Sequence, residues 1–230
     1  MADNITLAEL KRRARERADM ENSEFISDSE LTSYINTAYL ALYDILVSRF
    51  EFYYTKQLEF TIPQNEAEFL VPNDFYKLDG LDFKLGAGQD GWTTVTKWNF
   101  KERNRNRSLL RLDYRNVNPR QYRLIANKID IQPKDRAAGD YRLFYTPRAT
   151  RLANDSDTVD AVNGWEDYIV LVAAMKMLAK EESDISAIVL EIRDIEDRIE
   201  AMSQNRDDEP ERVTDMNPFG WRQDTWWTDW

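Results

Sequence analysis

Cysteine and histidine are both missing from the 230 residues of the chain. The lack of cysteine excludes disulfides, thiolate metal sites and cysteine nucleophiles. The lack of histidine excludes Ser-His-Asp catalysis, HExxH zinc sites and a histidine pH switch. Carboxylate-only chemistry remains open. We expect a protein that is not an enzyme and that has no bound metal and no cofactor.

Long apolar runs are missing as well, because no stretch reaches the roughly 18–20 residues of a membrane span. The first residues, MADNITLAELKRRARER, lack the apolar segment of a secretory signal, so we expect no cleaved leader. The apolar fraction of 42% and the charged fraction of 32% are typical of a soluble folded protein. A net charge of −11 argues against general binding to nucleic acid.

Two capping boxes predict the starts of two N-terminal helices. Thr6 stands three residues before Glu9, and Ser27 stands three residues before Glu30. After the second box, apolar residues recur at three- and four-residue steps from Leu31 to Leu46, which indicates an amphipathic helix. We expect these helices near residues 6–20 and 28–49.

The first helix carries a basic flank. Glu9, Glu16 and Asp19 dilute its positive charge. We interpret it as a solvated helix face, with contacts between subunits as the alternative. The basic residues are Lys11, Arg12, Arg13, Arg15 and Arg17.

Two more helices are predicted after residue 160. WEDYIVLVAAMKMLAKEES is apolar almost all round, as a buried central helix is. DISAIVLEIRDIEDRIEAMSQN has its apolar residues on one stripe. Only a few residues join the two, so we expect them to lie antiparallel. The stripe consists of Ile185, Ile188, Val189, Ile192, Ile195, Ile199 and Met202.

Between residues 51 and 150 the pattern changes to short aromatic and β-branched runs with Pro, Gly and Asn between them. We predict a mostly antiparallel β region with one irregular polar stretch near 101–120. ANK, between YRLI and IDIQP, is typical of a hairpin turn. GAGQDGW lacks the Lys-Ser/Thr of a phosphate-binding loop and opens no helix, so we interpret it as a hairpin loop.

The order helix-helix, strands, helix-helix, tail predicts an α+β fold. Each helix pair is too small to bury its apolar stripe alone, so we expect the two pairs to form one four-helix bundle with the antiparallel β region inserted between them. The predicted parts are a helical body (1–50 and 155–205), an inserted β-rich region (51–154) and an extended C-terminal tail (206–230).

Four stretches in this order carry a resemblance: LAELKRRARERADMENSEFISDSELTSYINTAYLALYDIL, VPNDFYKLDGLD, YRLIANKIDIQPKDRAAGDYRLFYTP and DSDTVDAVNGWEDYIVLVAAMKMLAKEESD. Together, over about residues 5–205, they resemble the head-to-tail adaptor (connector) proteins of tailed bacteriophages. The resemblance implies a helical bundle that assembles as a ring, usually a dodecamer, below the portal protein. Such a ring extends the DNA channel and offers a platform to the tail tube or nozzle protein. The protein would then be made in the bacterial host cytoplasm and reside in the neck of the virion, away from any membrane.

The tail beyond residue 205 ends NPFGWRQDTWWTDW and holds four of the seven tryptophans of the chain. One interpretation is a disordered end. Against it, one buried aromatic side chain covers ~150–250 Å², up to about 4–6 kcal/mol at ~25 cal/mol per Å², whereas ordering costs roughly 1–2 kcal/mol per residue. Summed over about sixteen residues the two are comparable, so we expect the tail to stay loose on the free monomer and to order only where a partner supplies pockets or a strand edge. We expect it to dock on the portal ring or on a neighbouring adaptor subunit. The docking residues would be Phe219, Trp221, Trp226, Trp227 and Trp230.

Residues 101–123, KERNRNRSLLRLDYRNVNPRQYR, form a basic island on an acidic chain. Three interpretations stay open: a solvated loop, a patch for an acidic partner or adjacent subunit, and contact with DNA phosphates. A channel that must pass DNA quickly gains little from arginines that hold phosphates, so we expect at most weak contact with the DNA inside the ring. The candidate contacts are Arg103, Arg105, Arg107, Arg111 and Arg115.

Two other functions compete with the adaptor. Asp74, Asp82 and Lys84 loosely match a metal-dependent nuclease, in which two acids hold Mg²⁺ and a lysine polarises water. This pattern arises easily by chance in a chain rich in Asp and Lys. The other alternative is a carbohydrate- or peptide-binding module whose surface aromatics stack on a ligand.

Overall fold

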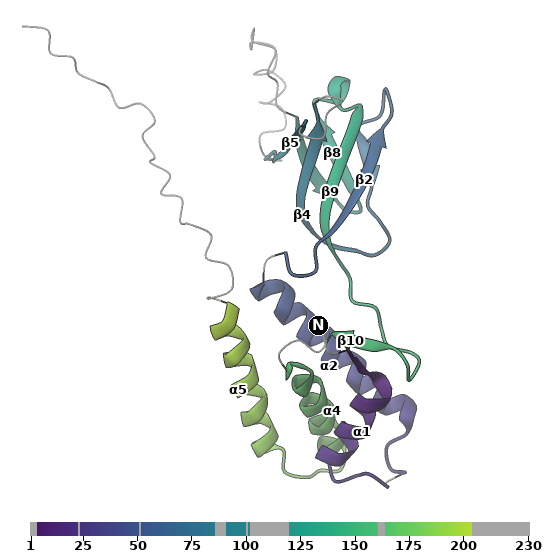
Figure 1. The fold of residues 1–230 in the computed structure, drawn as a ribbon, viewed down its shortest axis with the longest axis vertical. Helices are drawn as coiled ribbons and strands as arrows, with labels where there is room; N and C mark the ends of the chain where they lie inside the picture. Colours follow the sequence, from purple (N-terminus) through teal and green to yellow (C-terminus); the bar gives the residue numbers. More distant parts are fainter. Residues whose placement is uncertain are drawn as a thin grey trace, which may run out of the picture.

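The computed structural model describes residues 4–22, 24–50, 52–85, 91–99, 101, 120–160 and 164–203. The molecule is elongated, with helices at one end of its longest axis and β-sheets at the other (Figure 1). Buried apolar side chains form two clusters, one among the helices and one between the sheets. Two chain segments, residues 50–55 and 148–157, join these parts, and we call the region where they pass between the parts the neck.

Helix α4 (Glu166–Lys180) lies at the centre of the helical part, with α1 (Leu7–Arg17), α2 (Asp28–Arg49) and α5 (Ser186–Ser203) packed against it. Its buried side chains point in all directions, which confirms the predicted buried central helix. Helices α4 and α5 run antiparallel, as expected from their short connection (Figure 1). Four side chains of α4 are fully buried: Ile169, Ala173, Ala174 and Met177.

The predicted four-helix bundle is wrong, although the α+β class stands. In a four-helix bundle the helices lie nearly parallel or antiparallel side by side around a shared core, with none of them at the centre. Helix α1 has 11 residues against the 22 of α2. Helix α1 follows directly on β1 (Asn4–Thr6), which pairs with β10 (Thr158–Asp160) in a two-stranded sheet. The predicted bundle contained no such sheet. On its other side a groove lined by Arg17 and Glu191 separates α1 from α5 and reaches Val170 of α4. The helices therefore surround α4 without closing a bundle.

Both predicted capping boxes mark real helix starts. The Thr6 hydroxyl accepts from the backbone N–H of Glu9 at 3.2 Å, and the Ser27 hydroxyl accepts from that of Glu30 at 3.3 Å. Each hydroxyl satisfies one of the backbone donors that a helix N-terminus leaves open. The observed helices begin at Leu7 and Asp28, within one residue of the prediction.

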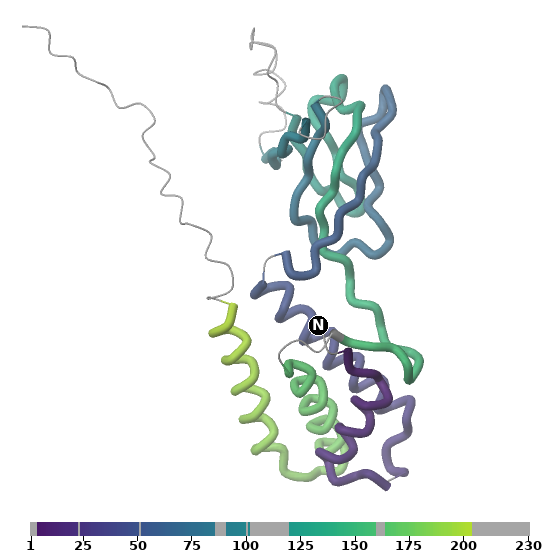
Figure 2. The backbone as a smooth tube through the Cα atoms, in the orientation of Figure 1, coloured from purple at the N-terminus to yellow at the C-terminus, as the bar shows by residue number. Residues whose placement is uncertain are grey.

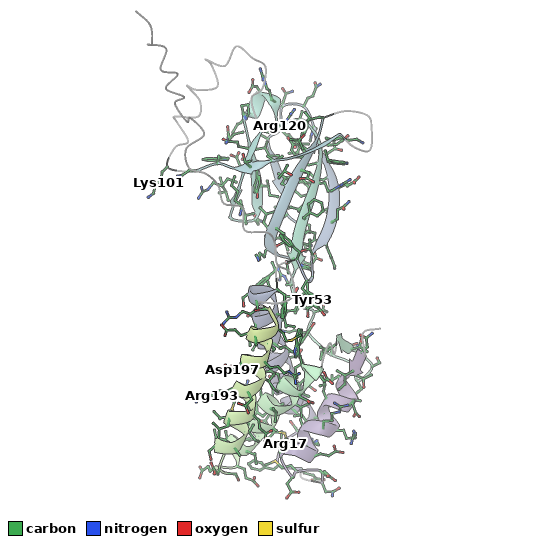
Figure 3. All side chains as sticks on the ribbon, turned by 60° about the vertical axis from the view of Figure 1, so that its left-hand side comes forward. Arg17, Tyr53, Lys101, Arg120, Arg193 and Asp197 are labelled. Atoms are coloured by element: carbon green, nitrogen blue, oxygen red, sulfur yellow. The ribbon has the colours of Figure 1, made fainter. Side chains whose placement is uncertain are left out.

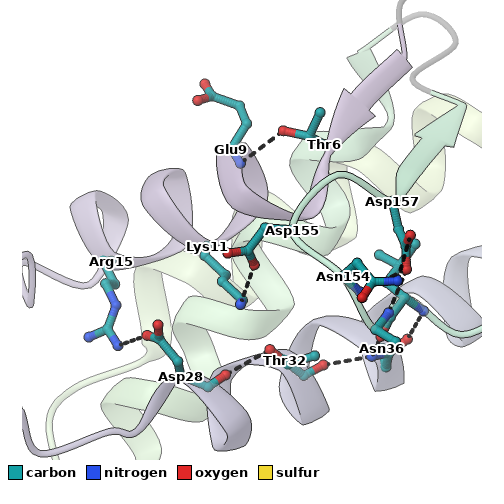
Figure 4. Close-up of polar contacts among 12 residues, drawn as sticks. Thr6, Glu9, Lys11, Arg15, Asp28, Thr32, Asn36, Asn154, Asp155 and Asp157 are labelled. Carbon is teal, nitrogen blue, oxygen red and sulfur yellow. Dashed lines mark hydrogen bonds and ion pairs between the residues drawn. The ribbon is translucent and has the colours of Figure 1, made fainter.

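The segment that returns from the sheets is fixed to α1 and α2 by side chains (Figure 4). The Lys11 ammonium donates to Asp155 at 2.7 Å. The Asn36 side chain donates to the carbonyl of Leu152 at 2.9 Å and accepts from its N–H at 2.8 Å. The Asp157 carboxylate accepts from two successive backbone N–H groups, which closes the turn before β10. These bonds replace the sheet or helix pairing that an irregular segment lacks.

Acid is expected to destabilise the protein through its paired carboxylates. Hydrogen bonds from Arg12 and Arg13 lower the pKa of Glu9 to about 2, and backbone N–H groups lower the pKa of Asp157. A carboxyl whose pKa is lower in the folded state stabilises the fold above its unfolded pKa, and this contribution is lost as pH falls through the folded value. Since no histidine is present, we expect a flat free energy of unfolding from about pH 6 to 8 and a fall below about pH 4.5.

Urea unfolding at a series of pH values measures this dependence. The Asp157→Asn variant keeps the acceptor oxygen and removes the titrating carboxyl. We expect its free energy of unfolding to change less steeply with pH between about 4.5 and 2 than that of the wild type. Equal slopes for the two proteins would contradict the assignment to Asp157.

The β region consists of two four-stranded sheets that enclose the second apolar cluster. Figure 2 shows the backbone of this region beyond the helices along the long axis. All pairs in the first sheet are antiparallel, and in the second only β6 and β7 pair in parallel, which confirms the mostly antiparallel prediction. The first sheet has the order β2 (Lys56–Ile62), β9 (Gly139–Pro147), β4 (Phe75–Lys84), β5 (Trp92–Thr94). The second has the order β3 (Glu68–Leu70), β8 (Lys128–Gln132), β7 (Gln121–Ile125), β6 (Thr96–Lys97).

Both predicted hairpins are confirmed by the pairing of their strands. Ile125 of β7 pairs with Lys128 of β8, which leaves a two-residue turn at ANK. Lys84 of β4 pairs with Trp92 of β5, so the strands that flank GAGQDG are antiparallel neighbours. A phosphate-binding loop would instead lead from a strand into a helix.

Gly139→Ala is expected to lower the free energy of unfolding by about 1–3 kcal/mol. Gly139 has φ +140°, and an added Cβ would lie 2.6 Å from a ring carbon of Phe83. That ring is buried and packs against Tyr141 at 5.1 Å between centroids, so it has little room to move. Urea denaturation measures the difference. At Gly80 an added Cβ meets nothing nearer than 3.7 Å, so Gly80→Ala is the control and should change stability by less than about 1 kcal/mol.

Candidate functional site: the neck and its groove

The neck is closed by tyrosines from α2 and β4. The Tyr43 hydroxyl donates to the carbonyl of Pro147 at the end of β9, and the Tyr43 ring stacks on Tyr54 with centroids 4.6 Å apart. The Tyr76 hydroxyl donates to Asp44 at 2.8 Å. Burial, with smaller effects from neighbouring rings and carboxylates, raises the pKa of Tyr43, so this hydroxyl stays a donor at all ordinary pH values. These contacts tie the end of the longest helix to both central strands of the first sheet.

A second set of bonds holds the strands at the point where they enter the neck. The hydroxyls of Thr55 and Thr146 both donate to Asp79, each at 2.9 Å. The Tyr145 hydroxyl donates to Asp74 at 3.1 Å. Thr55 precedes β2, Asp79 lies in β4 and Thr146 in β9, so one carboxylate joins three strand segments. We infer a rigid neck, since its hydrogen bonds come from both connections between the two parts.

A groove of about 700 Å³ opens beside these tyrosines, and we call it the neck groove. Its walls come from the last turns of α2, from the first half of β4, and from β6 and β7 with the residue after β6. The lining residues are Asp44, Val47, Ser48, Tyr76, Lys77, Leu78, Lys97, Trp98, Arg123 and Leu124.

The neck groove combines aromatic and apolar surface with positive charge. Lys77, Lys97 and Arg123 contribute three cations, against one carboxylate from Asp44. The Arg123 guanidinium lies 5.6 Å from the centre of the Trp98 ring and donates to the Trp98 carbonyl at 3.3 Å. On a chain of net charge −11, this local excess of positive charge favours an anionic ligand with apolar or aromatic groups.

The basic island 101–123 is rooted on the β region. Figure 3 shows Lys101 and Arg120, the described residues at its two borders, on the sheets and away from the helices. Arg120 packs over the Phe83 ring at 3.4 Å and donates to the Arg136 carbonyl at 2.7 Å, so this arginine stabilises the β region itself. The candidate contacts lie outside the described residues: Arg103, Arg105, Arg107, Arg111 and Arg115.

The basic flank of α1 is neutralised within the subunit. Arg12 binds Glu9 and Glu16, and Arg17 binds Glu191 across the groove to α5. The structure thus supports the interpretation as a solvated helix face whose charges are paired within the subunit. The remaining cations pair in the same way: Lys11 with Asp155, Arg13 with Glu9, and Arg15 with Asp28.

The tail residues also lie outside the described part, which ends at Ser203: Phe219, Trp221, Trp226, Trp227 and Trp230. The end of α5 is described and is bonded to α2. Glu200, in the last turn of α5, accepts from Arg49 in the last turn of α2 at 3.1 Å. Helix α5 therefore ends at the neck, beside the helix that forms one wall of the neck groove.

The structure separates the three residues of the nuclease hypothesis. Asp74 immediately precedes β4, whereas Asp82 and Lys84 lie at its far end. Eight residues of extended strand span roughly 26 Å, so Asp74 and Asp82 cannot bind the same metal ion. The described residues contain no group of three acidic, histidine or cysteine side chains that could hold a metal ion. The apparent motif is a coincidence of sequence.

A known protein family matches nearly the whole chain. Residues 5–222 match the family model of the SU10 adaptor protein. The chain belongs to this family. Membership supports the role of a phage adaptor and of a structural protein of the virion. This agrees with the resemblance to phage adaptor proteins noted from the sequence. No curated protein matches the chain.

The family match extends beyond the last helix, to residue 222, and so includes the first tryptophan of the tail. The described helices include none long and apolar enough to cross a membrane. Sequence reasoning did not single out the neck groove, because its residues come from four separate segments of the chain. The one local signal was TKW, where Lys97 ends a short strand and Trp98 follows it.

Proposed function

We propose that the protein is a structural head-to-tail adaptor that forms a ring, usually a dodecamer in proteins of this kind, below the portal of a tailed phage. The ring extends the DNA channel and carries the next tail component, a tube or nozzle protein. The observation that supports this proposal most strongly is the family match over residues 5–222. The rigid neck supports it as well, because an adaptor has to hold two contact surfaces at a fixed distance.

The parts of the chain take different roles in this proposal. The helical body, residues 1–50 and 155–205, packs side by side through head-to-tail contacts between identical subunits, which close a ring without a twofold axis. The β-rich region, 51–154, faces the next tail component and exposes Leu70 and Leu85 (58% and 68% exposed). The tail, 206–230, docks on the portal ring or on a neighbouring subunit.

DNA passes through the ring with at most weak contact. The net charge of −11 disfavours retention of DNA, and the α1 cations already have carboxylate partners. The basic island 101–123 is the segment proposed for any contact with DNA phosphates. Neutralising Arg103, Arg105 and Arg107 tests this: loss of salt-dependent DNA binding would assign the island to DNA, and unchanged binding would assign it to a protein contact or to solvent.

Mass photometry of the purified protein, with and without portal protein, tests the ring. One chain has a mass of 27.2 kDa, so a dodecamer is expected at about 330 kDa. A ring on its own or on the portal supports the proposal. A monomer under both conditions contradicts it, and a monomer whose tryptophan fluorescence is quenched by a sugar or peptide would favour the binding module.

A further inference from the structure

We infer that the neck groove binds the C-terminal segment 206–230 of the same chain in the free subunit. The sequence alone predicted a tail that stays loose on the free monomer. We depart from that expectation because the structure provides a groove that can cover indole rings near the end of α5. The inference concerns the subunit before assembly, so it can fail while ring formation on the portal holds, and the reverse.

The first argument is complementarity. Segment 206–230 contains seven carboxylate side chains, three arginines and four tryptophans. The groove presents Lys77, Lys97 and Arg123 around an apolar and aromatic lining. None of the described carboxylates forms an ion pair with Lys77 or Lys97. Acidic residues such as Asp224 and Asp229 alternate with indoles in the tail, so cation–carboxylate and cation–aromatic contacts can form together.

The second argument is size and shape. A volume of about 700 Å³ lies within the range of sites that hold drug-sized ligands, ~300–1,000 Å³. Val47, Leu78 and Leu124 supply aliphatic surface, and Trp98 is 7% exposed and so forms part of a firm wall. Tyr76 is 49% exposed with its hydroxyl held by Asp44, so its ring faces the groove in a fixed position. Such a surface accommodates indole rings better than a fully polar cleft does.

The third argument is proximity. Glu200 of α5 bonds to Arg49, and Ser48, the residue before Arg49, lines the groove. Helix α5 ends at the neck on the side of the molecule where β5 lies (Figures 1 and 2). About eighteen residues lead from Ser203 to Trp221, which as a flexible chain span ~20–25 Å on average and up to ~60 Å when extended. A tether of this length gives an effective concentration on the order of millimolar, so even weak affinity fills the groove.

The consequence is a tail with two alternative positions. In the free subunit the groove covers part of the indole surface, which limits aggregation of an otherwise exposed aromatic segment. In the assembly the portal or a neighbouring subunit offers competing pockets, and many tails bind at once. Release from the groove then accompanies assembly.

The lack of cysteine permits a direct test in the full-length protein. In Ser48→Cys with Thr225→Cys, one thiol lies at the groove wall and the other in the tail between the indoles. Thr37→Cys with Thr225→Cys is the matched control. Thr37 lies eleven residues earlier, on the same face of α2 and about 16 Å away along the helix axis. Both positions are exposed, and both hydroxyls bond to a carbonyl of the preceding turn.

Under mild oxidation, the Ser48 pair is expected to form an intrachain disulfide at least about tenfold faster than the Thr37 pair, as measured by intact mass and peptide mapping. Lys77→Glu with Lys97→Glu should slow the reaction of the Ser48 pair severalfold. Lys176→Glu with Lys180→Glu makes the same change of charge at the end of α4 away from the neck, where Lys180 pairs with Glu30 near the start of α2, and should leave the rate unchanged. Equal rates for the Ser48 and Thr37 pairs, or disulfides that form only between chains, would overturn the inference.

Discussion

Trp165→Ala is expected to lower the free energy of unfolding by about 3–5 kcal/mol. Trp165 is 3% exposed and directly precedes α4, the helix on which the other three pack. Its ring stacks on Phe50, the C-cap of α2, with centroids 5.3 Å apart. Loss of the indole leaves a cavity where the central helix, the end of α2 and the neck meet, and a close-packed core refills such a space only in part.

Two controls make this measurement specific. Trp165→Phe keeps a ring against Phe50 and should cost less than half as much. Trp92→Ala removes a half-buried indole that lies at the surface of β5 under Arg142, 4.1 Å from the ring centre, and should cost about 1 kcal/mol. Urea denaturation followed by far-UV circular dichroism gives all three values. If Trp165→Ala and Trp92→Ala were equally destabilising, α4 would not be the centre of the helical core.

The local patterns of the sequence predicted the helices well, because a helix start is decided by a few adjacent residues. Thr6 and Ser27 cap their helices as expected. The stripe of α5 is confirmed at Ile188, Ile192 and Ile199, which are buried. Met202, at its end, is 46% exposed because α5 extends past the edge of the core there.

The arrangement of the helices was not predictable in the same way. A stripe of apolar residues shows which face is buried and does not show which element covers it. Strands β1 and β10 have three residues each and pair across more than 150 positions, Ile5 with Val159, so they leave no periodicity to detect. These missed strands set the position of α1, and the predicted bundle is wrong for this reason.

The neck was missed because its chemistry is built from distant residues. From the sequence, Asp74 is only a possible nuclease carboxylate, and Asp79 has no predicted role. In the structure Asp74 accepts from Tyr145 and lies 3.5 Å from Lys56, while Asp79 accepts from Thr55 and Thr146. Side-chain pairs separated by 67 or 71 positions leave no spacing signal. The candidate site could be found only once the strands were placed.

Six of the seven tryptophans fall into two groups with different physical roles, and the half-buried Trp92 stands apart from both. Trp98 and Trp165 are 7% and 3% exposed and stabilise the β region and the helical body. The other four follow the last helix in the sequence and lie outside the described residues. An indole gains free energy only when it is covered, so the tail group has to be covered by a groove or a partner. This division leads to the functional prediction with the largest expected effect.

A chain that ends at Asn205 is expected to lose at least about 100-fold in apparent affinity for the portal, because the tails of one ring bind together and their weak contacts multiply. Co-sedimentation or mass photometry at several protein concentrations measures the loss. The full-length variant with alanine at Trp221, Trp226, Trp227 and Trp230 separates the indoles from the backbone of the tail. It should reproduce most of the effect, since aromatic anchors dominate such interfaces.

Stability has to be measured beside affinity, because a truncated protein that unfolds would also fail to bind. The described residues contain both apolar clusters, so removal of 206–230 should change the free energy of unfolding by less than about 1 kcal/mol. Undiminished co-assembly with the portal by a stably folded truncated chain would rule out tail docking on the portal. Normal portal binding combined with loss of the subunit-to-subunit ring would instead assign the tail to a neighbouring adaptor. The two outcomes differ because a portal contact and a contact between adaptors remove different species from the mass distribution.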